Sequence, residues 1–169
     1  MEQNQLPASY WVEHLRLSPH PEGGYYREVY RAAEHIQTSG LPGRFQGPRN
    51  FATSIYYLLE AGDFSAFHRI KSDETWHFYA GAPLELHMVQ GSKHSVVILG
   101  NRPERGEELQ YTVPHGVWFA SRPCTDAAYS LLGCTVSPGF DFADFEMGAV
   151  EHVLADRLDL IPVLSHLFR

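Results

Sequence analysis

The residues of this chain best suited to chemistry are a histidine and a glutamate that lie close together between two glycines. His68 and Glu74 are six positions apart, with Gly62 before them and Gly81 after them. An imidazole and a carboxylate in one cavity can act as two ligands of a divalent metal ion. They can equally act as a general acid–base pair, in which the carboxylate orients the imidazole and raises its pKa. Residue type and spacing leave both chemistries open.

Two predicted strands, residues 64–71 and 74–80, carry this pair. Side chains alternate between the two faces of a strand, so the alternation defines which residues accompany His68 and Glu74. The side chains that share these faces are Phe64, Ala66, Ile70, Trp76 and Phe78. If both faces look into a barrel, His68 and Glu74 meet across the hairpin that joins the two strands. The same alternation directs His77 outward, unless a β-bulge near the turn reverses it.

Small and aromatic side chains are predicted to contact a ligand beside this pair. The predicted contacts are Ser54, Tyr56, Trp76, Phe78, Phe119 and Cys134. Either Tyr56 or Tyr57 faces inward, because neighbouring residues of a strand point in opposite directions, and the pattern does not decide which. Cys134 is interpreted as a small apolar residue of the pocket wall rather than as a nucleophile.

Charged residues outside these strands offer further contacts near the mouth of a pocket. Arg27, on a predicted strand at residues 25–33, is a candidate contact for an anionic ligand. Asp141, Asp144 and Glu146 follow a predicted mouth loop and could bind a ligand at the rim or form a solvated turn. The Pro-Glu-Gly-Gly segment at residues 21–24 is interpreted as a backbone turn that leads into the strand.

Short β-segments at regular spacing dominate the rest of the chain, and turn residues separate them. Beyond those named above, the predicted strands are residues 53–59, 84–90, 95–99, 109–113, 117–121, 127–136 and 145–147. A short helix is predicted at residues 9–16, a long loop at 34–50 and a helical tail at 150–168. No helical crossovers interrupt the strands, so the pattern predicts an all-β sandwich or barrel with short terminal helices.

Composition limits the class of protein. The 169 residues fit one globular domain, residues 1–169, with 44% hydrophobic and 13% aromatic residues. A net charge of −7 without a basic stripe argues against a nucleic-acid partner. No apolar run is long enough to cross a membrane, and the amino terminus lacks the features of a secretory signal. Two cysteines, Cys124 and Cys134, do not form a disulfide framework, so we expect a cytoplasmic protein.

The spacing around His68 resembles that of the cupin superfamily. The first motif of that superfamily is Gly-x5-His-x-His-x3–4-Glu-x6-Gly, and Gly62, His68, Glu74 and Gly81 match it. The second motif, Pro-x-Gly-x-x-His, resembles the Pro-His-Gly-Val-Trp-Phe segment at residues 114–119. The chain is more closely similar to the small cupins called cupin-5 or DUF985. The segments that carry this likeness are residues 20–28, 54–59, 72–78, 113–120 and 132–140.

The resemblance implies a double-stranded β-helix, the jelly-roll barrel of cupins, that assembles as a homodimer. It brings no established reaction with it. It also implies that two of the four usual metal-ligand positions are occupied by Ile70 and Phe119, neither of which can coordinate a metal. We therefore expect no cofactor, with a divalent metal held by His68 and Glu74 as the alternative.

Three functions are compatible with these residues. The first, which we favour, is an enzyme that uses His68 and Glu74 for acid–base chemistry on a small polar or sugar-like metabolite, as an epimerase, isomerase or lyase would. The second is a pocket that binds such a ligand without changing it. The third is a metal-dependent cupin enzyme.

Overall fold

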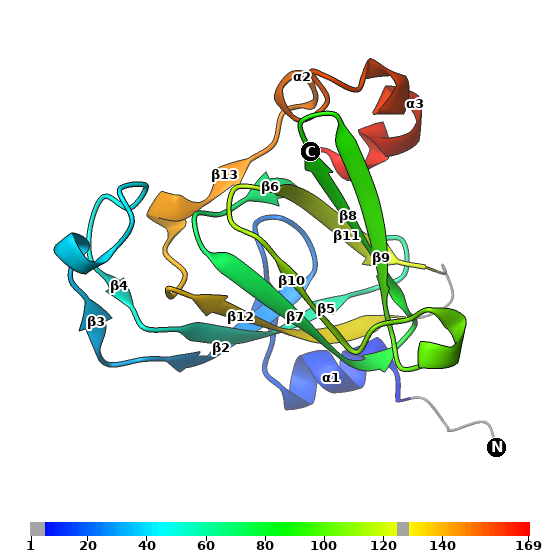
Figure 1. The fold of residues 1–169 in the computed structure, drawn as a ribbon. Helices are drawn as coiled ribbons and strands as arrows, with labels where there is room; N and C mark the ends of the chain where they lie inside the picture. The colour runs from blue at the N-terminus through cyan, green and yellow to red at the C-terminus, as the bar shows by residue number, and fades with distance from the viewer. Residues whose placement is uncertain (1–5, 125–128) are drawn as a thin grey trace.

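Two antiparallel sheets face each other and enclose the interior of the protein (Figure 1). The computed structural model describes residues 6–124 and 129–169. The six-stranded sheet consists, in spatial order, of β1 (Ser18–Pro19), β2 (Tyr25–Arg31), β5 (Thr53–Leu59), β12 (Ser130–Ser137), β7 (Asp73–Gly81) and β10 (Gln110–Val113). The five-stranded sheet consists of β13 (Glu146–Met147), β6 (Ser65–Arg69), β11 (Trp118–Pro123), β8 (Leu84–Gln90) and β9 (Lys93–Leu99).

The chain winds around the barrel by passing from one sheet to the other. Consecutive strands β5, β6, β7 and β8 lie alternately in the six-stranded and the five-stranded sheet. The later strands β10, β11 and β12 alternate in the same way. This winding is the double-stranded β-helix, so the predicted all-β jelly-roll fold is confirmed.

The hydrophobic core fills one end of the space between the sheets. Strand alternation directs large side chains inward from both sheets, among them Trp76 and Phe78 from β7 and Leu84 and Leu86 from β8. All four are at most 8% exposed. This packed end holds the two sheets in register and leaves the opposite end of the barrel open for a cavity.

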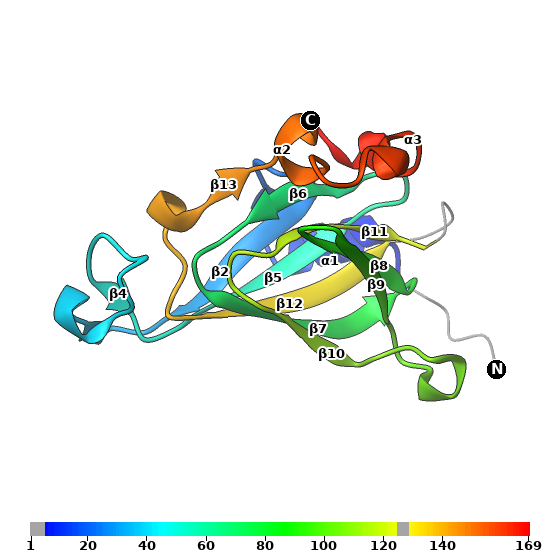
Figure 2. The ribbon, with the colours of Figure 1, turned by 45° about the horizontal axis from the view of Figure 1, so that its top comes forward.

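Helical segments cover the outer faces of the barrel (Figure 2). Helix α1 (Ala8–His14) packs on the outer face of the six-stranded sheet, where Trp11 contacts the cluster around Leu58 and Leu131. The carboxyl-terminal helices α2 (Val150–Val153) and α3 (Ile161–Leu164) lie on the outer face of the five-stranded sheet. The 3-10 helices are η1 (Thr38–Gly40), η2 (Pro103–Arg105), η3 (Phe142–Asp144), η4 (Leu158–Leu160) and η5 (Ser165–Leu167). None of the described helices is both long and apolar enough to cross a membrane.

An arm that includes a short hairpin projects from the barrel beside the open end (Figure 1). It contains β3 (His35–Ile36), η1 and β4 (Arg49–Asn50), within the stretch predicted as a loop. A buried ion pair attaches this arm to the barrel, because Nε and Nη2 of Arg49 each donate to the Asp144 carboxylate at 2.6 Å. Asp144 is therefore a structural residue, whereas the sequence left it as a candidate rim ligand.

The predicted strand boundaries agree closely with the observed ones. Strands β5 and β8 begin and end at the predicted residues. β12 begins at Ser130, and residues 127 and 128 of the predicted strand lie outside the described residues. The predicted helical tail consists of α2, α3 and 3-10 turns rather than one continuous helix.

Candidate functional site

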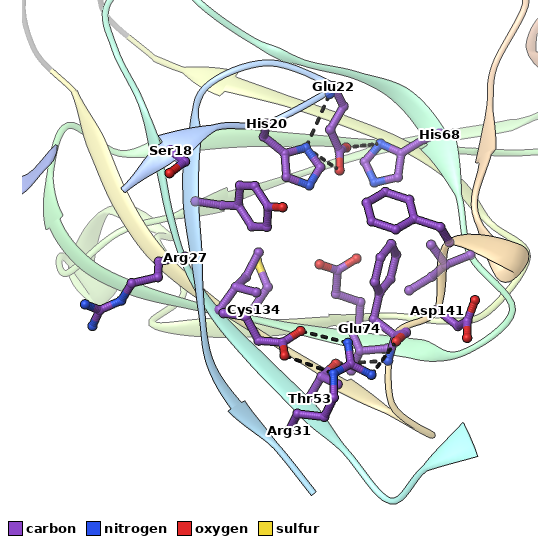
Figure 3. Close-up of a pocket in the computed structure, with 17 residues that line it drawn as sticks. Ser18, His20, Glu22, Arg27, Arg31, Thr53, His68, Glu74, Cys134 and Asp141 are labelled. Carbon is purple, nitrogen blue, oxygen red and sulfur yellow. Dashed lines mark hydrogen bonds and ion pairs between the residues drawn. The ribbon is translucent and has the colours of Figure 1, made fainter. Parts of the chain in front are cut away.

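A cavity of about 660 Å³ occupies the open end of the barrel (Figure 3). Its walls come from both sheets, from the turn before β2 and from the loop after β12. The lining residues are Ser18, His20, Glu22, Tyr26, Arg27, Glu28, Arg31, Thr53, Ile55, His68, Ile70, Glu74, Cys134, Val136, Phe140, Asp141 and Phe142. This volume is typical of sites for small metabolites.

His68 is held by a carboxylate that comes from a different part of the chain. The Nδ1 atom of His68 lies 2.7 Å from Oε2 of Glu22 and 2.7 Å from the carbonyl oxygen of Ala66. Both partners accept hydrogen bonds, so Nδ1 carries a proton. The second ring nitrogen, Nε2, is turned toward the cavity (Figure 3). His68 therefore presents one titratable nitrogen to a ligand.

The charge of Glu22 controls the protonation of His68. Burial lowers the pKa of His68, but the charge and hydrogen bond of Glu22 outweigh burial and raise that pKa above its ordinary value. Burial likewise raises the pKa of Glu22, but the charges of His68 and His20 and the hydrogen bonds from His68 and Ser65 together outweigh burial and leave that pKa lowered. Both shifts favour the imidazolium–carboxylate form, in which Nε2 of His68 carries a proton that faces the cavity.

A glycine turn places Glu22 inside the barrel. Gly23 has a φ of +115°, and a Cβ atom at this position would overlap the carbonyl oxygen of Phe64. The turn is held by the Tyr57 hydroxyl, which donates to the carbonyl of Gly23 at 2.7 Å. The Ser65 hydroxyl donates to Glu22 at 2.9 Å. These contacts fix the carboxylate against His68 before any ligand binds.

Glu74 faces the same cavity from the six-stranded sheet and has no ion-pair partner within 4 Å among the described residues. Burial raises its pKa, the charge of His68 lowers it, and the nearby Glu22 raises it, with the result that the pKa of Glu74 is about 7. Cys134 lines the cavity beside Glu74, and its thiol also lowers the pKa of this carboxyl group. Burial also raises the pKa of Cys134 well above its ordinary value, so this cysteine stays a neutral thiol. Glu74 therefore exchanges a proton near physiological pH.

A small inner chamber lies between the cavity and the core. Its volume is about 10 Å³, which approaches the space needed for one water molecule. Glu22, His68, Glu74 and Cys134 border it on the cavity side, and Trp76 borders it from the core. The Nε1 atom of Trp76 is buried and has no hydrogen-bond partner among the described residues. The indole N–H is thus available to a water or ligand atom in this chamber.

His68 and Glu74 share the cavity as predicted, but the predicted hairpin between them is wrong. β6 pairs with β11 and β13, whereas β7 pairs with β10 and β12. The two side chains therefore face each other across the barrel from opposite sheets. The prediction for Phe64 is also wrong, because it packs with the carboxyl-terminal cluster, while Ser65 faces the inner chamber next to a register shift between β6 and β11.

The predicted ligand contacts divide into three groups. Cys134 lines the cavity and Trp76 the inner chamber. Phe78 and Phe119 lie in the adjoining core, where the ring centroid of Phe119 is 4.1 Å from that of His68. Ser54 and Tyr56 do not line the cavity, because they lie on the opposite face of β5 from Thr53 and Ile55. Their placement corrects the predicted set.

The structure resolves the alternatives that alternation left open. Tyr57 is the inward tyrosine, whereas Tyr56 packs outside with Tyr79. His77 lies on the outer face of β7, where its Nε2 is 3.3 Å from the Thr135 hydroxyl. The register shift between β7 and β12 lies beyond His77, near Leu131, so it does not turn His77 inward.

Sequence reasoning missed Glu22 and His20, which lie in the segment interpreted as a backbone turn. Nδ1 of His20 is 3.2 Å from Oε1 of Glu22, and burial lowers the pKa of His20. No periodicity marks these residues. Two signals could have pointed to them. Residues 20–28 are one of the segments that resemble cupin-5 proteins. An ordinary turn also needs neither a histidine nor a glutamate before its glycines.

The side chains of the site do not fit a cupin-type metal centre. Ile70 lines the cavity at one ligand position and Phe119 occupies another in the core. Nδ1 of His68 is already engaged by Glu22. In the described part of the chain, no three His, Cys, Asp or Glu side chains form a group that could hold a metal ion. Of the four cupin ligand positions, only those of His68 and Glu74 carry a side chain that can coordinate a metal. Two protein ligands are fewer than the three that are usual even in open catalytic sites.

Comparison with solved structures identifies two close relatives. A protein from Shewanella oneidensis is 37% identical, with a TM-score of 0.86 over 98% of this chain and 99% of that chain. A hypothetical protein from Leishmania major is 38% identical, with a TM-score of 0.78 over 96% of this chain and 97% of that chain. No curated protein matches the chain.

More distant neighbours share the fold alone. Oxalate decarboxylase from Bacillus subtilis is 16% identical, with a TM-score of 0.53 over 81% of this chain and 33% of that chain.

The family model of the Cupin_5 proteins, described as cupin superfamily (DUF985), matches residues 9–148. With its barrel, its cavity and relatives that match over nearly their whole length, the chain belongs to the Cupin_5 family of the cupin superfamily.

Proposed function

We propose that this cupin is an acid–base enzyme that acts on a small polar or sugar-like metabolite, as an epimerase, isomerase or lyase does. The observation that carries the proposal is the pair of proton-exchanging groups on opposite walls of one cavity. His68 lies on β6 and Glu74 on β7, so a ligand between the sheets is reached from two sides. Environments that give neighbouring groups different protonation states are typical of acid–base sites.

The pair can labilise a proton on a carbon next to a carbonyl group. Ionised Glu74 takes the proton from carbon, while the Nε2–H of His68 donates to the carbonyl oxygen, and the product is an enol. An epimer forms when a solvent proton reaches the opposite face of this carbon, the enol O–H returns its proton to His68 and Glu74 releases its proton to solvent. If the carbon carries a hydroxyl group, an isomer forms when Glu74 returns its proton to the former carbonyl carbon and the hydroxyl gives its proton to His68. Loss of a leaving group from the next carbon gives an elimination. Each route begins with the same proton removal.

Glu22 serves as a positioning residue in this scheme. Its carboxylate holds the Nδ1–H of His68 at 2.7 Å and keeps Nε2 aimed at the cavity. Because the hydrogen bond favours the imidazolium, Glu22 also maintains the donor form of His68. A neutral or absent partner would leave the imidazole buried without its counter-charge.

Hydrogen–deuterium exchange tests the proposal whatever the final product is. Metabolites that raise the melting temperature are incubated with the protein in D2O, and NMR follows the loss of the proton next to the carbonyl. We expect exchange with the natural protein and a loss of about 10²–10⁴-fold in His68→Gln and Glu74→Gln. His77→Gln is the matched control, because His77 lies on β7 but outside the cavity.

The outcomes separate the proposal from its rivals. Equal exchange in His68→Gln and His77→Gln would contradict the acid–base role. A ligand that binds to the natural protein and undergoes neither exchange nor turnover would identify a binding protein. The homodimer and the cytoplasmic location stay predictions.

A further inference from the structure

The charged side chains around the cavity have an unequal distribution of partners. Arg31 is fully engaged at the mouth, because Nε and Nη2 donate to the Glu28 carboxylate at 2.9 and 2.7 Å. Its Nη1 donates to Asn50 and to the carbonyl of Phe140. The guanidinium of Arg27 lies 5.7 Å from the ring centroid of Tyr56, which is outside the cavity, and Figure 3 shows it turned away. Among the described lining residues, no lysine or other arginine remains to meet an anion.

Carboxylates, in contrast, are available at both ends of the cavity. Glu74 has no ion pair at the inner end among the described residues, and Glu22 is matched by His68. At the rim, Asp141 uses one oxygen to accept a hydrogen bond from the Ala143 amide at 2.8 Å. The charge of Asp141 helps to raise the pKa of Arg31, but the two side chains form no ion pair in the described structure. The cavity therefore presents more unmatched negative than positive charge.

Aromatic rings border the rim next to this negative charge. Phe140 and Phe142 flank Asp141 in the loop after β12, with ring centroids 5.0 Å apart. Ring faces attract organic cations through their quadrupole, and rings combined with a carboxylate are the surroundings in which proteins bind ammonium groups.

We infer that the ligand of this cavity is a metabolite that carries a protonated amine and no carboxylate or phosphate. Its ammonium group lies at the rim, beside Asp141 and the rings of Phe140 and Phe142. Its reacting carbon lies deeper, between His68 and Glu74, and in this respect the inference rests on the proposed function. An anion would meet Glu74, and the nearby imidazolium of His68 is already matched by the carboxylate of Glu22.

Matched sets of compounds that differ only in one charged group test this inference. The first set is 6-amino-6-deoxy-D-glucose, D-glucose and D-glucuronate, which differ only at carbon 6. The second is 3-amino-1,2-propanediol, glycerol and glycerate, and the third is benzylamine, benzyl alcohol and benzoate. Binding to the full chain is measured at pH 8 by thermal shift and isothermal titration calorimetry, with no requirement for turnover.

We expect the amine of at least one set to bind about tenfold or more tightly than its alcohol, with no binding of the carboxylate. Asp141→Asn keeps an acceptor for the Ala143 amide and removes only the charge, so it should reduce the preference for the amine about tenfold. Glu108→Gln, an exposed acid outside the lining, should leave the preference unchanged.

Two results would overturn the inference: a carboxylate that binds as tightly as its amine, or no binding by any of the three amines. The hydrogen–deuterium exchange experiment tests the proposed function independently of these binding measurements. Amine binding without exchange removes the proposed reaction and leaves the ligand class in place. Exchange with an anionic metabolite would support the proposed reaction and would contradict the inferred ligand class.

Discussion

Nδ1 of His68 lies 2.7 Å from Oε2 of Glu22, although 46 positions separate the two residues (68 − 22) in the chain. The contact joins the turn before β2, on the side of the six-stranded sheet, to β6 of the five-stranded sheet. It thereby sets both the tautomer and the direction of the imidazole that faces the cavity. The histidine at the centre of the site is thus positioned by a residue outside its own motif.

Glu22→Gln should lower the pKa of His68. The variant keeps a hydrogen-bond acceptor but removes the charge that raises this pKa, so burial, which lowers it, becomes dominant. Any activity that needs protonated His68 should then decline at a lower pH than in the natural protein. NMR titration of the His68 ring measures the change directly, and Glu28→Gln at the mouth is the control. A His68 titration that does not move in Glu22→Gln would show that Glu22 does not control it.

Compared with the natural protein, Glu74→Gln should be more stable at alkaline pH than it is at acid pH. The pKa of Glu74 is about 7 in the folded protein, above its ordinary value of 4.5, so the folded state binds this proton more tightly. The contribution of Glu74 to stability is therefore present below the unfolded pKa and is lost as the pH rises to about 7. From pH 5 to pH 8, the free energy of unfolding of the variant should gain about 2–3 kcal/mol over the natural protein.

Urea unfolding at both pH values measures this difference for Glu74. The exposed residue Glu104 supplies the control, because Glu104→Gln removes a solvated carboxylate and should change the two curves equally. If Glu74→Gln and the natural protein keep a constant difference from pH 5 to pH 8, Glu74 does not titrate in this range.

Asp144→Asn should destabilise the protein far more than loss of an exposed acid. Asp144 and Arg49 have side chains that are 3% and 6% exposed, and removal of one charge leaves the other buried without a partner. The expected loss in the free energy of unfolding is about 3–5 kcal/mol. Glu146→Gln breaks the exposed pair with Arg69, whose side chain is 40% exposed, and should cost less than about 1 kcal/mol. Similar losses in both variants would mean that the buried pair does not anchor the arm.

Ile70→His should create a metal site in a protein that otherwise has too few ligands for one. The new imidazole would join His68 and Glu74 at the cavity wall and bring the protein ligands to the three usual in catalytic zinc sites. After incubation with Zn²⁺ and dialysis, elemental analysis should find about one equivalent in the variant and a substoichiometric amount in the natural protein. Ile70→His with His68→Gln should lose the metal again. A full, His68-dependent equivalent in the natural protein would revive the metal-dependent alternative.

The sequence alone determined the elements of this fold and the direction of many side chains. Strand β5 and strand β8 were predicted to the residue, and alternation correctly directed His68 and Glu74 inward and His77 outward. These features are local, because the period of two follows from the backbone of a single strand. Turn residues act over the same short range.

The tertiary structure decided which residues meet. It assigned β6 and β7 to opposite sheets, turned Tyr57 rather than Tyr56 inward and brought Glu22 to His68. Each of these results depends on pairing between segments far apart in the chain, such as β12 with β5 and β7. The periodicity of one strand carries no information about its partner strand, so the residues that surround His68 and Glu74 emerged only from the assembled barrel.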